Sequence, residues 1–342
     1  MLHPITLLEN FRWPTQIPGE VLALTLLITF TMLSTLEFCV PRDKLPAQHL
    51  RLSYQTNISL FVVNSLILSL LSAMSLLTLA EQYSEHGLLT NRWLSPVWRG
   101  VLVFFMLDLT LYIWHKAAHS FDCLWLFHKV HHNDPYLNIS TSFRIHIVEL
   151  IITQALKALL IILLGIDVSV LMSSEAVMTL FIMFHHSNIC FKGEKLLGYL
   201  FIVPSLHRTH HSKQRCEHDS NYGAVFSLWD RLFGTLKQCH VAQIGIQGSS
   251  PQDLVNLIAF GFTIPTPAIE IANLDAMIAE AAYYKAEKRG FYPGDDIRDW
   301  LEAKRDILAL VCANKSLKHK VNHQRQWSYF KFIPTQIGVH NF

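Results

Sequence analysis

The stretch VWRGVLVFFMLDLTLYIWHKAAH, residues 97–119, joins an apolar run to a pair of histidines. The run from Val97 to Trp114 is broken near its middle by Asp108 and approaches the length that a bilayer crossing needs. His115 and His119 follow at positions i and i+4, so a continuing helix places both imidazoles on one face. The stretch therefore predicts a membrane helix that ends in a pair of candidate metal ligands.

The composition and four further apolar runs place the whole chain in the membrane class. Of its 342 residues, 51% are hydrophobic and only 16% are charged, which is too apolar for a typical soluble domain. A bilayer crossing takes about 20 apolar residues, and runs of that order lie at residues 21–40, 58–80, 147–164 and 168–184. The sequence therefore predicts an all-α, integral-membrane helical bundle of about four to five membrane helices.

Charges in the loops predict which face of the membrane carries the histidines. The loop after the first run holds three basic residues within residues 42–51, whereas residues 81–95 hold fewer. Cytoplasmic loops carry an excess of lysine and arginine, so the first loop is expected in the cytoplasm and residues 81–95 on the opposite side. Counting crossings then places residues 115–146, and everything from His185 onward, in the cytoplasm. The histidine-rich stretches thus form a predicted cap on one membrane face.

Histidine spacing is the strongest chemical signal in the chain. The motif HxxHH occurs at His128-Lys129-Val130-His131-His132 and again at His207-Arg208-Thr209-His210-His211. Residues at i, i+3 and i+4 share one face of a helix. Clustered imidazoles repel one another when protonated, and a metal removes that cost because it binds the neutral form. Two HxxHH motifs and one HxxxH pair at the same membrane face therefore predict a metal site.

The number of imidazoles indicates two ions rather than one. Tetrahedral zinc takes four ligands and catalytic zinc usually takes three, so eight to ten histidines exceed one coordination sphere. Imidazole suits iron, zinc, copper and nickel, and ligand type alone leaves the metal open. Two other classes of protein stay open: a membrane metal-binding or transport protein without redox catalysis, and a bis-histidine haem protein. A transporter would place its ligands near the bilayer midplane, whereas these histidines fall at the ends of the apolar runs.

An ordered series of motifs resembles the fatty acid hydroxylase/sterol desaturase superfamily. The resemblance runs from Asp108 to Thr235 and implies a non-haem di-iron centre, O2 as co-substrate and a lipid substrate. Its elements are, in order, Asp108, Tyr112, His115 and His119; Leu124-Trp125; Phe127 to His132; His186-Ser187-Asn188; Pro204 to Ser212; Asn221-Tyr222-Gly223; and Trp229 to Thr235.

The same resemblance implies which residues hold two iron ions. His146 matches a family position that is usually followed by proline, and here Ile147 follows. His186 is preferred to its neighbour His185, whose position varies in the family. The implied metal ligands are His115, His119, His128, His131, His132, His146, His186, His207, His210 and His211.

Polar residues near these histidines are expected to support them. Asp108 is an ionisable group inside an apolar run, which is costly and usually functional, and it lies two helical turns before His115. Two interpretations stay open: Asp108 orients a ligand imidazole, or it forms a buried hydrogen bond with Tyr112. The supporting candidates are Asp108, Tyr112 and Asn221, with Glu149 and Asp219 as further residues that could orient histidines.

The predicted reaction is the O2-dependent hydroxylation or desaturation of a lipid. A metal site at the mouth of apolar helices meets lipid chains directly, and a pair of iron ions can activate O2 for attack on an unactivated C–H bond. The sequence contains no HExxH, GxGxxG, CxxCH or iron–sulfur cysteine pattern. Electrons are therefore expected from a separate reductase or small carrier. The net charge of +2 implies no nucleic-acid partner.

A small second module is expected near the end of the chain. Residues 273–312 have a helical pattern with a stop at Gly290 and a cap at Asp295 or Asp296. The stretches at 278–283 and 299–303 resemble a small bacterial domain of unknown function, which implies a bacterial source and an inner-membrane location. The expected domains are membrane helices at 1–100, a di-iron catalytic domain at 101–248, an interfacial linker at 249–272, a helical hairpin at 273–312 and a tail at 313–342.

Overall fold

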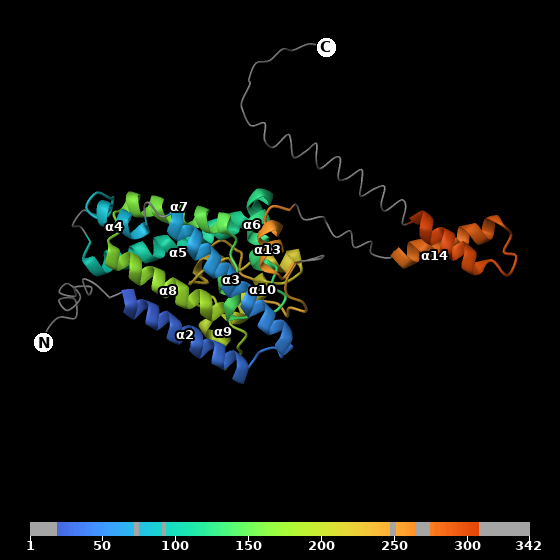
Figure 1. The fold of residues 1–342 in the computed structure, drawn as a ribbon, viewed down its shortest axis with the longest axis horizontal. Helices are drawn as coiled ribbons and strands as arrows, with labels where there is room; N and C mark the ends of the chain where they lie inside the picture. The colour runs from blue at the N-terminus through green and yellow to red at the C-terminus, as the bar shows by residue number, and fades with distance from the viewer. Residues whose placement is uncertain (1–18, 72–74, 91–93, 247–250, 264–273, 308–342) are drawn as a thin grey trace, which may run out of the picture. The chain divides into compact units, whose positions relative to one another are not determined.

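The computed structural model describes residues 19–71, 75–90, 94–246, 251–263 and 274–307. Every regular element in these ranges is helical (Figure 1), so the all-α prediction is confirmed. The chain divides into two compact units, Met1–Pro267 and Ala268–Phe342, and the histidine motifs all belong to the first.

Within the described ranges, four helices are long and apolar enough to cross a membrane. Many of their large apolar side chains point away from the protein, as at Leu27, which is 61% exposed. Water would make such exposure costly, at about 25 cal/mol for each Å² of apolar surface, whereas lipid would not. The chain is therefore an integral membrane protein. The four helices are α2 (Gly19–Cys39), α5 (Pro96–Ser120), α7 (Ile147–Leu164) and α8 (Val168–His186).

The predicted span at residues 58–80 is wrong as a single helix. The structure has α3 (Ala47–Leu71) and a separate α4 (Leu76–Tyr83), which begins at an N-cap where the Ser75 side chain accepts a hydrogen bond from the Thr78 amide. Asn57 and Asn64 on α3 are buried and donate to polar groups of the histidine-rich region. On α3, polar side chains that form hydrogen bonds with other parts of the chain take the place of lipid-facing apolar residues. This explains why α3 is less apolar than the membrane helices.

Helices α3 and α4 carry the chain from one end of the α7–α8 pair to the other. The Arg42 amide donates to the Asn188 carbonyl just after α8, whereas Leu88 and Leu89 donate to carbonyls at the end of α7. Accordingly, α4 lies at the end opposite the histidines (Figure 1). At the histidine end lie α6 (Asp122–His132), α10 (Pro204–His210) and α13 (Leu254–Phe260).

The tight turn predicted between α7 and α8 is confirmed. Gly165 ends α7 with φ of 70°, a left-handed conformation that glycine adopts without strain. The Asp167 side chain then accepts a hydrogen bond from the Val170 amide and caps α8. A Cβ atom on Gly87 would lie 1.8 Å from the Gly165 nitrogen, so the two backbones meet where only glycine fits.

Short elements complete the histidine end of the first unit. Part of the expected linker, α13, packs against α6 and α3 through Leu257, Val130 and Leu60. The buried Lys129 ammonium donates to the Thr263 carbonyl and lies 4.2 Å from the centre of the Phe260 ring. The remaining short elements are η1 (Ile139–Phe143), α9 (Glu194–Leu197), α11 (Arg215–His218) and α12 (Leu228–Leu232).

The second unit contains the predicted helical hairpin. Helix α14 (Leu274–Lys288) ends before Gly290, which has φ of 75°, and a second helix covers residues 296–307. Ile278 and Ala303 are buried, and Arg289 forms an ion pair with Asp299 at 2.5 Å. The hairpin thus has buried apolar side chains and an ion pair of its own.

Candidate metal centre

Four helices bring nine of the ten predicted ligands together. Helix α5 ends with two of them, α6 ends with three, and α8 contributes its last residue. Helix α10 carries two more, and its C-cap provides the ninth. These residues are His115 and His119 on α5; His128, His131 and His132 on α6; His186 on α8; and His207, His210 and His211 on or after α10.

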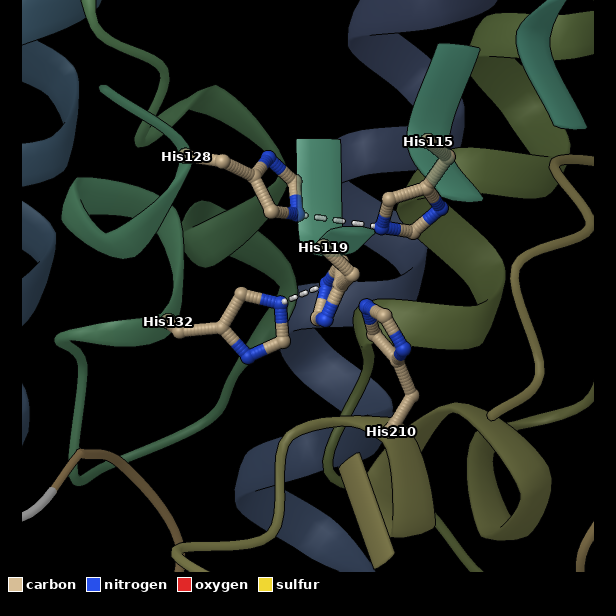
Figure 2. Close-up of side chains that lie close together, drawn as sticks. All are labelled: His115, His119, His128, His132 and His210. Carbon is tan, nitrogen blue, oxygen red and sulfur yellow. Dashed lines mark hydrogen bonds between the residues drawn. The ribbon is translucent and has the colours of Figure 1, made fainter. Parts of the chain in front are cut away.

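The nine imidazoles form two groups. Within each group, one ring nitrogen of every member lies within 4.8 Å of the corresponding nitrogens of the others. Figure 2 shows the rings of the five-membered group converging on a common space. The first group is His115, His119, His128, His132 and His210, and the second is His131, His186, His207 and His211.

The histidines of each HxxHH motif are divided between the two groups. His128 and His132, at i and i+4, belong to the first group, whereas His131 belongs to the second. In the other motif His207 and His211 belong to the second group, and His210 crosses to the first. Adjacent residues on an α-helix point about 100° apart because a turn takes 3.6 residues. Each motif therefore reaches both groups and holds them side by side.

Short distances between ring nitrogens fit side chains that would share a metal ion. The Nε2 atoms of His115 and His128 lie 3.1 Å apart, as do those of His119 and His132. In the second group, His207 Nε2 lies 2.9 Å from His186 Nε2 and 3.0 Å from His211 Nε2. Two nitrogens bound to one ion at about 2.1 Å can be at most about 4.2 Å apart, so each of these pairs could bind a common ion.

Burial keeps the imidazoles in the form that a metal binds. Burial, with smaller repulsion from neighbouring imidazoles, lowers the pKa of His128 and of His131 to about 3, so both rings are neutral at pH 7. The Nε2 atom of His210 is buried and has no hydrogen-bond partner among the described residues. An unpaired nitrogen that faces four others is costly unless it has a ligand. The residues of the two groups therefore fit ligands of a metal site.

Backbone carbonyls orient several of the rings through contacts with their Nδ1 atoms. The Nδ1 atom lies 2.9 Å from the Tyr222 carbonyl in His115 and 2.7 Å from the Ser220 carbonyl in His210. His186 and His131 make similar contacts, at 2.7 Å to Ile182 and at 3.2 Å to Arg144. A proton fixed on Nδ1 leaves the Nε2 lone pair free for a metal and sets the ring plane.

Two carboxylates support the first group, as expected for Glu149 and Asp219. Glu149 on α7 accepts a hydrogen bond from Nδ1 of His128 at 2.7 Å, and Asp219 lies 3.2 Å from Nδ1 of His119. Glu149 is buried, whereas the Asp219 side chain is 35% exposed and also contacts Arg215. A carboxylate behind a ligand imidazole fixes its tautomer and raises its basicity.

Asp108, Tyr112 and Asn221 support the site by holding one loop, residues 220–226, rather than by touching a histidine. Asp108 accepts hydrogen bonds from the Val225 amide at 2.9 Å and from the Trp229 indole at 2.7 Å. Asp108 is therefore bonded to this loop and not to Tyr112, and its effect on a ligand imidazole is indirect, through the loop.

The other two candidates secure the same loop from its far side. Tyr112 shares a hydrogen bond with Thr235 at 2.8 Å, and Thr235 donates to Asp230, which accepts from the Tyr222 amide. Asn221 adopts φ of 54° and donates to carbonyls of Leu206 and Lys237. Since this loop presents the Ser220 and Tyr222 carbonyls, its position sets the orientation of His210 and His115.

The structure places His146 outside both groups. Its Nδ1 accepts a hydrogen bond from the Val148 amide at 3.2 Å and caps α7, and its Nε2 lies 3.2 Å from the Ile258 carbonyl. Both ring nitrogens are thereby used, which leaves no lone pair for a metal. His185 also lies outside the groups, with its ring 4.0 Å from that of His207.

Several residues of the site were missed from the sequence. Glu37, near the end of α2, accepts hydrogen bonds from the Tyr54 hydroxyl at 2.8 Å and from the amides of Ile139 and Asn188. It thereby ties the first membrane helix to the loops beside the second group. An acidic residue within an apolar run was the signal that singled out Asp108, and it applies equally to Glu37.

A second missed feature is the buried pair Asp134 and Arg144. Asp134 accepts hydrogen bonds from Ser53 and Asn57, and Arg144 donates to Asn57 at 3.0 Å and to the Val130 carbonyl at 3.1 Å. Burial alone would raise the pKa of Asp134, but Arg144 and the hydrogen bonds outweigh it and hold that pKa below its usual range. The pair fixes the loop whose carbonyl orients His131.

Buried neutral imidazoles at the end of a bundle of apolar helices define a histidine-ligated, metal-binding membrane protein. Residues 100–235 match the family described as fatty acid hydroxylase. This match covers about two fifths of the chain, and residues 273–309 match a second family, described as a protein of unknown function, DUF2934. No solved structure matches the chain.

Named relatives are lipid-modifying enzymes that the chain matches in part. An ornithine lipid hydroxylase of Rhizobium tropici is 31% identical over 48% of this chain and 50% of its own length. Alkylglycerol monooxygenases are 32% identical in Caenorhabditis elegans, over 42% of this chain and 28% of the relative, and 28% identical in Homo sapiens, over 53% and 40%. The chain therefore spans half or less of the length of these relatives.

Proposed function

We propose that the chain is a membrane-bound, non-haem di-iron oxygenase that uses O2 and external electrons to hydroxylate a C–H bond of a membrane lipid. The observation that carries this proposal is the presence of two groups of imidazoles, one of five and one of four, at the ends of apolar helices. Hydroxylation is preferred to desaturation because the relatives are named as a hydroxylase and as monooxygenases.

Iron held by the two groups would supply the redox chemistry that O2 activation needs. Inserting one oxygen atom into a C–H bond and releasing the other as water consumes two electrons and two protons. We propose that a separate reductase or small electron carrier delivers the electrons. Glu149, Asp219 and the loop at 220–226 would keep the ligand rings in fixed orientations during each turnover.

The proposed ligands are the nine residues of the two groups, without His146. The ring of His146 caps a helix and contacts a carbonyl, so it supports the fold of the site. The proposed substrate is a bilayer lipid with a polar headgroup, the class that the names of the relatives share. We further propose a bacterial inner-membrane location with the metal site on the cytoplasmic face.

Two measurements test this function. Elemental analysis and an absorption spectrum of protein produced with iron should give close to two iron ions per chain and no haem band. Lipids of producing cells, compared with cells that carry His207→Ala, should contain a species with one additional oxygen atom. One ion per chain, a haem spectrum, or metal uptake into vesicles with unchanged lipids would contradict the proposal and favour a haem or transport protein.

A further inference from the structure

An apolar patch lies on and just after two short helices that follow α8 in the chain, and not on the four candidate membrane helices. Its side chains are between 46% and 75% exposed. Exposed apolar patches of this kind mark surfaces that contact a membrane or another protein. We name it the α9–α12 patch, and it consists of Leu196, Tyr199, Leu200, Leu228, Leu232 and Phe233.

The depth of the patch follows from its contacts with α5. The Trp229 indole, on α12, donates to Asp108 at 2.7 Å. Asp108 lies midway along α5, twelve residues from Pro96 and twelve from Ser120, which places it about 18 Å from either end at 1.5 Å per residue. Helix α12 therefore packs beside the middle of a membrane helix rather than beyond its end.

A series of stacked rings holds both parts of the patch against membrane helices. Phe201, just after α9, stacks on Phe181 of α8 with ring centres 4.8 Å apart. Phe226, just before α12, stacks on Phe201 at 5.6 Å and on Phe105 of α5 at 4.8 Å. Phe105 precedes Asp108 by three residues and lies farther from the histidines along α5. The patch is thus anchored at a level where lipid surrounds the bundle.

Basic side chains lie at the edge of the patch. Lys192 and Lys195 are exposed and form no ion pair among the residues that the structure describes. Arg231 donates to the carbonyls of Gly198 and Tyr199 and lies 4.9 Å from the centre of the Tyr199 ring. Apolar side chains flanked by lysine and arginine are typical of elements at the boundary between lipid headgroups and acyl chains.

We propose that the α9–α12 patch is immersed in the bilayer, in the leaflet nearest the histidines, with its apolar side chains among the acyl chains and its basic side chains toward the headgroups. This differs from the sequence prediction that all residues after His185 lie in the cytoplasm. Tyr222, whose carbonyl orients His115, and Phe226, which packs against α5, both belong to the loop at residues 220–226 that leads into α12. The proposal rests on position alone and does not depend on the reaction.

Photocrosslinking in lipid vesicles tests the proposal. Full-length protein with benzoylphenylalanine at Leu196, Leu200 or Leu232 is reconstituted in phosphatidylethanolamine and phosphatidylglycerol, irradiated, and analysed by mass spectrometry for lipid adducts. The positive control is position Leu27 on α2, which is 61% exposed on a membrane helix. The negative control is Gln214, which is exposed at the start of α11. Helix α11 leads to Asp219, which contacts His119, about 16 Å beyond Asp108 along α5.

We expect lipid adducts at the patch positions to equal those at Leu27 and to exceed those at Gln214 about tenfold, because only a side chain among the acyl chains contacts lipid continuously. Adduct levels equal to those at Gln214 would overturn the proposal, as would crosslinks to a second copy of the chain in place of lipid. Metal content equal to that of the unmodified protein shows that each variant is folded, and three positions keep the test decisive if one variant misfolds.

Discussion

The carboxylate of Glu149 accepts a hydrogen bond from Nδ1 of His128 at 2.7 Å, so that α7 orients a ring carried by α6. Both side chains are buried. Among the described residues, this contact is the shortest hydrogen bond between a carboxylate and a ring of the first group. Glu149 thereby contacts Nδ1 of His128, whereas Nε2 of the same ring faces His115.

Replacing Glu149 by alanine should lower metal affinity and activity by about 10–100-fold, because the His128 ring would lose the partner that fixes its orientation. Glu149→Gln should be milder, since the amide oxygen can still accept the hydrogen bond. Metal titration followed by activity assay checks both variants. Glu85→Gln, at an exposed position, is the matched control, and equal effects from Glu85 and Glu149 would contradict the assigned role.

His146 should behave differently from the nine grouped histidines. His146→Asn should keep both metals, because asparagine is a good N-cap, whereas His146→Ala should lower stability by about 0.5–2 kcal/mol through loss of the cap. By contrast, alanine at His128, His131, His132, His207, His210 or His211 should reduce metal content and abolish activity. Metal analysis with thermal unfolding separates the two outcomes. Loss of one metal in His146→Asn would restore His146 to the ligand set.

Asp108→Asn should weaken the fold more than it changes the metal. The carboxylate accepts three hydrogen bonds, from Val225, Phe226 and Trp229. The side-chain amide nitrogen of asparagine is itself a donor and cannot accept any of them. A buried donor left unpaired costs about 1–3 kcal/mol. Thermal unfolding should show this loss while metal content stays near two. A variant of full stability that lacks metal would show instead that Asp108 acts directly on a ligand.

Membrane topology should place position 84 and the histidine end on opposite sides. The exposed native cysteines Cys39, Cys123, Cys190 and Cys216 are all near the histidine end, and Ser84 follows α4 at the other end. In intact cells, an impermeant thiol reagent should label Ser84→Cys and leave the native cysteines unlabelled until the cells are opened. Labelling of the native protein in intact cells would reverse the orientation.

A chain that ends at Thr266 should still bind both metals. All nine grouped histidines belong to the first unit, Met1–Pro267, and the hairpin forms its own ion pairs within the second. Metal content and thermal unfolding of the truncated protein, compared with the full chain, check this expectation. A truncated protein that is folded in the membrane but metal-free would show that the second unit helps to build the site.

Local patterns predicted the parts of the protein that depend on short stretches of chain. Apolar length alone located α2, α5, α7 and α8, because a bilayer crossing needs a continuous run. It failed for residues 58–80, where apolar composition could not show that Asn57 and Asn64 on α3 bind the loops beside the histidines. The pairing of a side chain with a distant backbone leaves no signal in local composition.

By itself, the sequence determined that histidines at helical spacing would meet at one membrane face, because periodicity fixes which side chains share a helix face. Only the tertiary structure decided how they divide. His131 and His132 are neighbours in the chain but belong to different groups, and so do His210 and His211. It also decided that His146 caps a helix. The same imidazole can bind a metal, a backbone amide or a carbonyl, and only the atoms that the folded chain places within about 3 Å determine which one it binds.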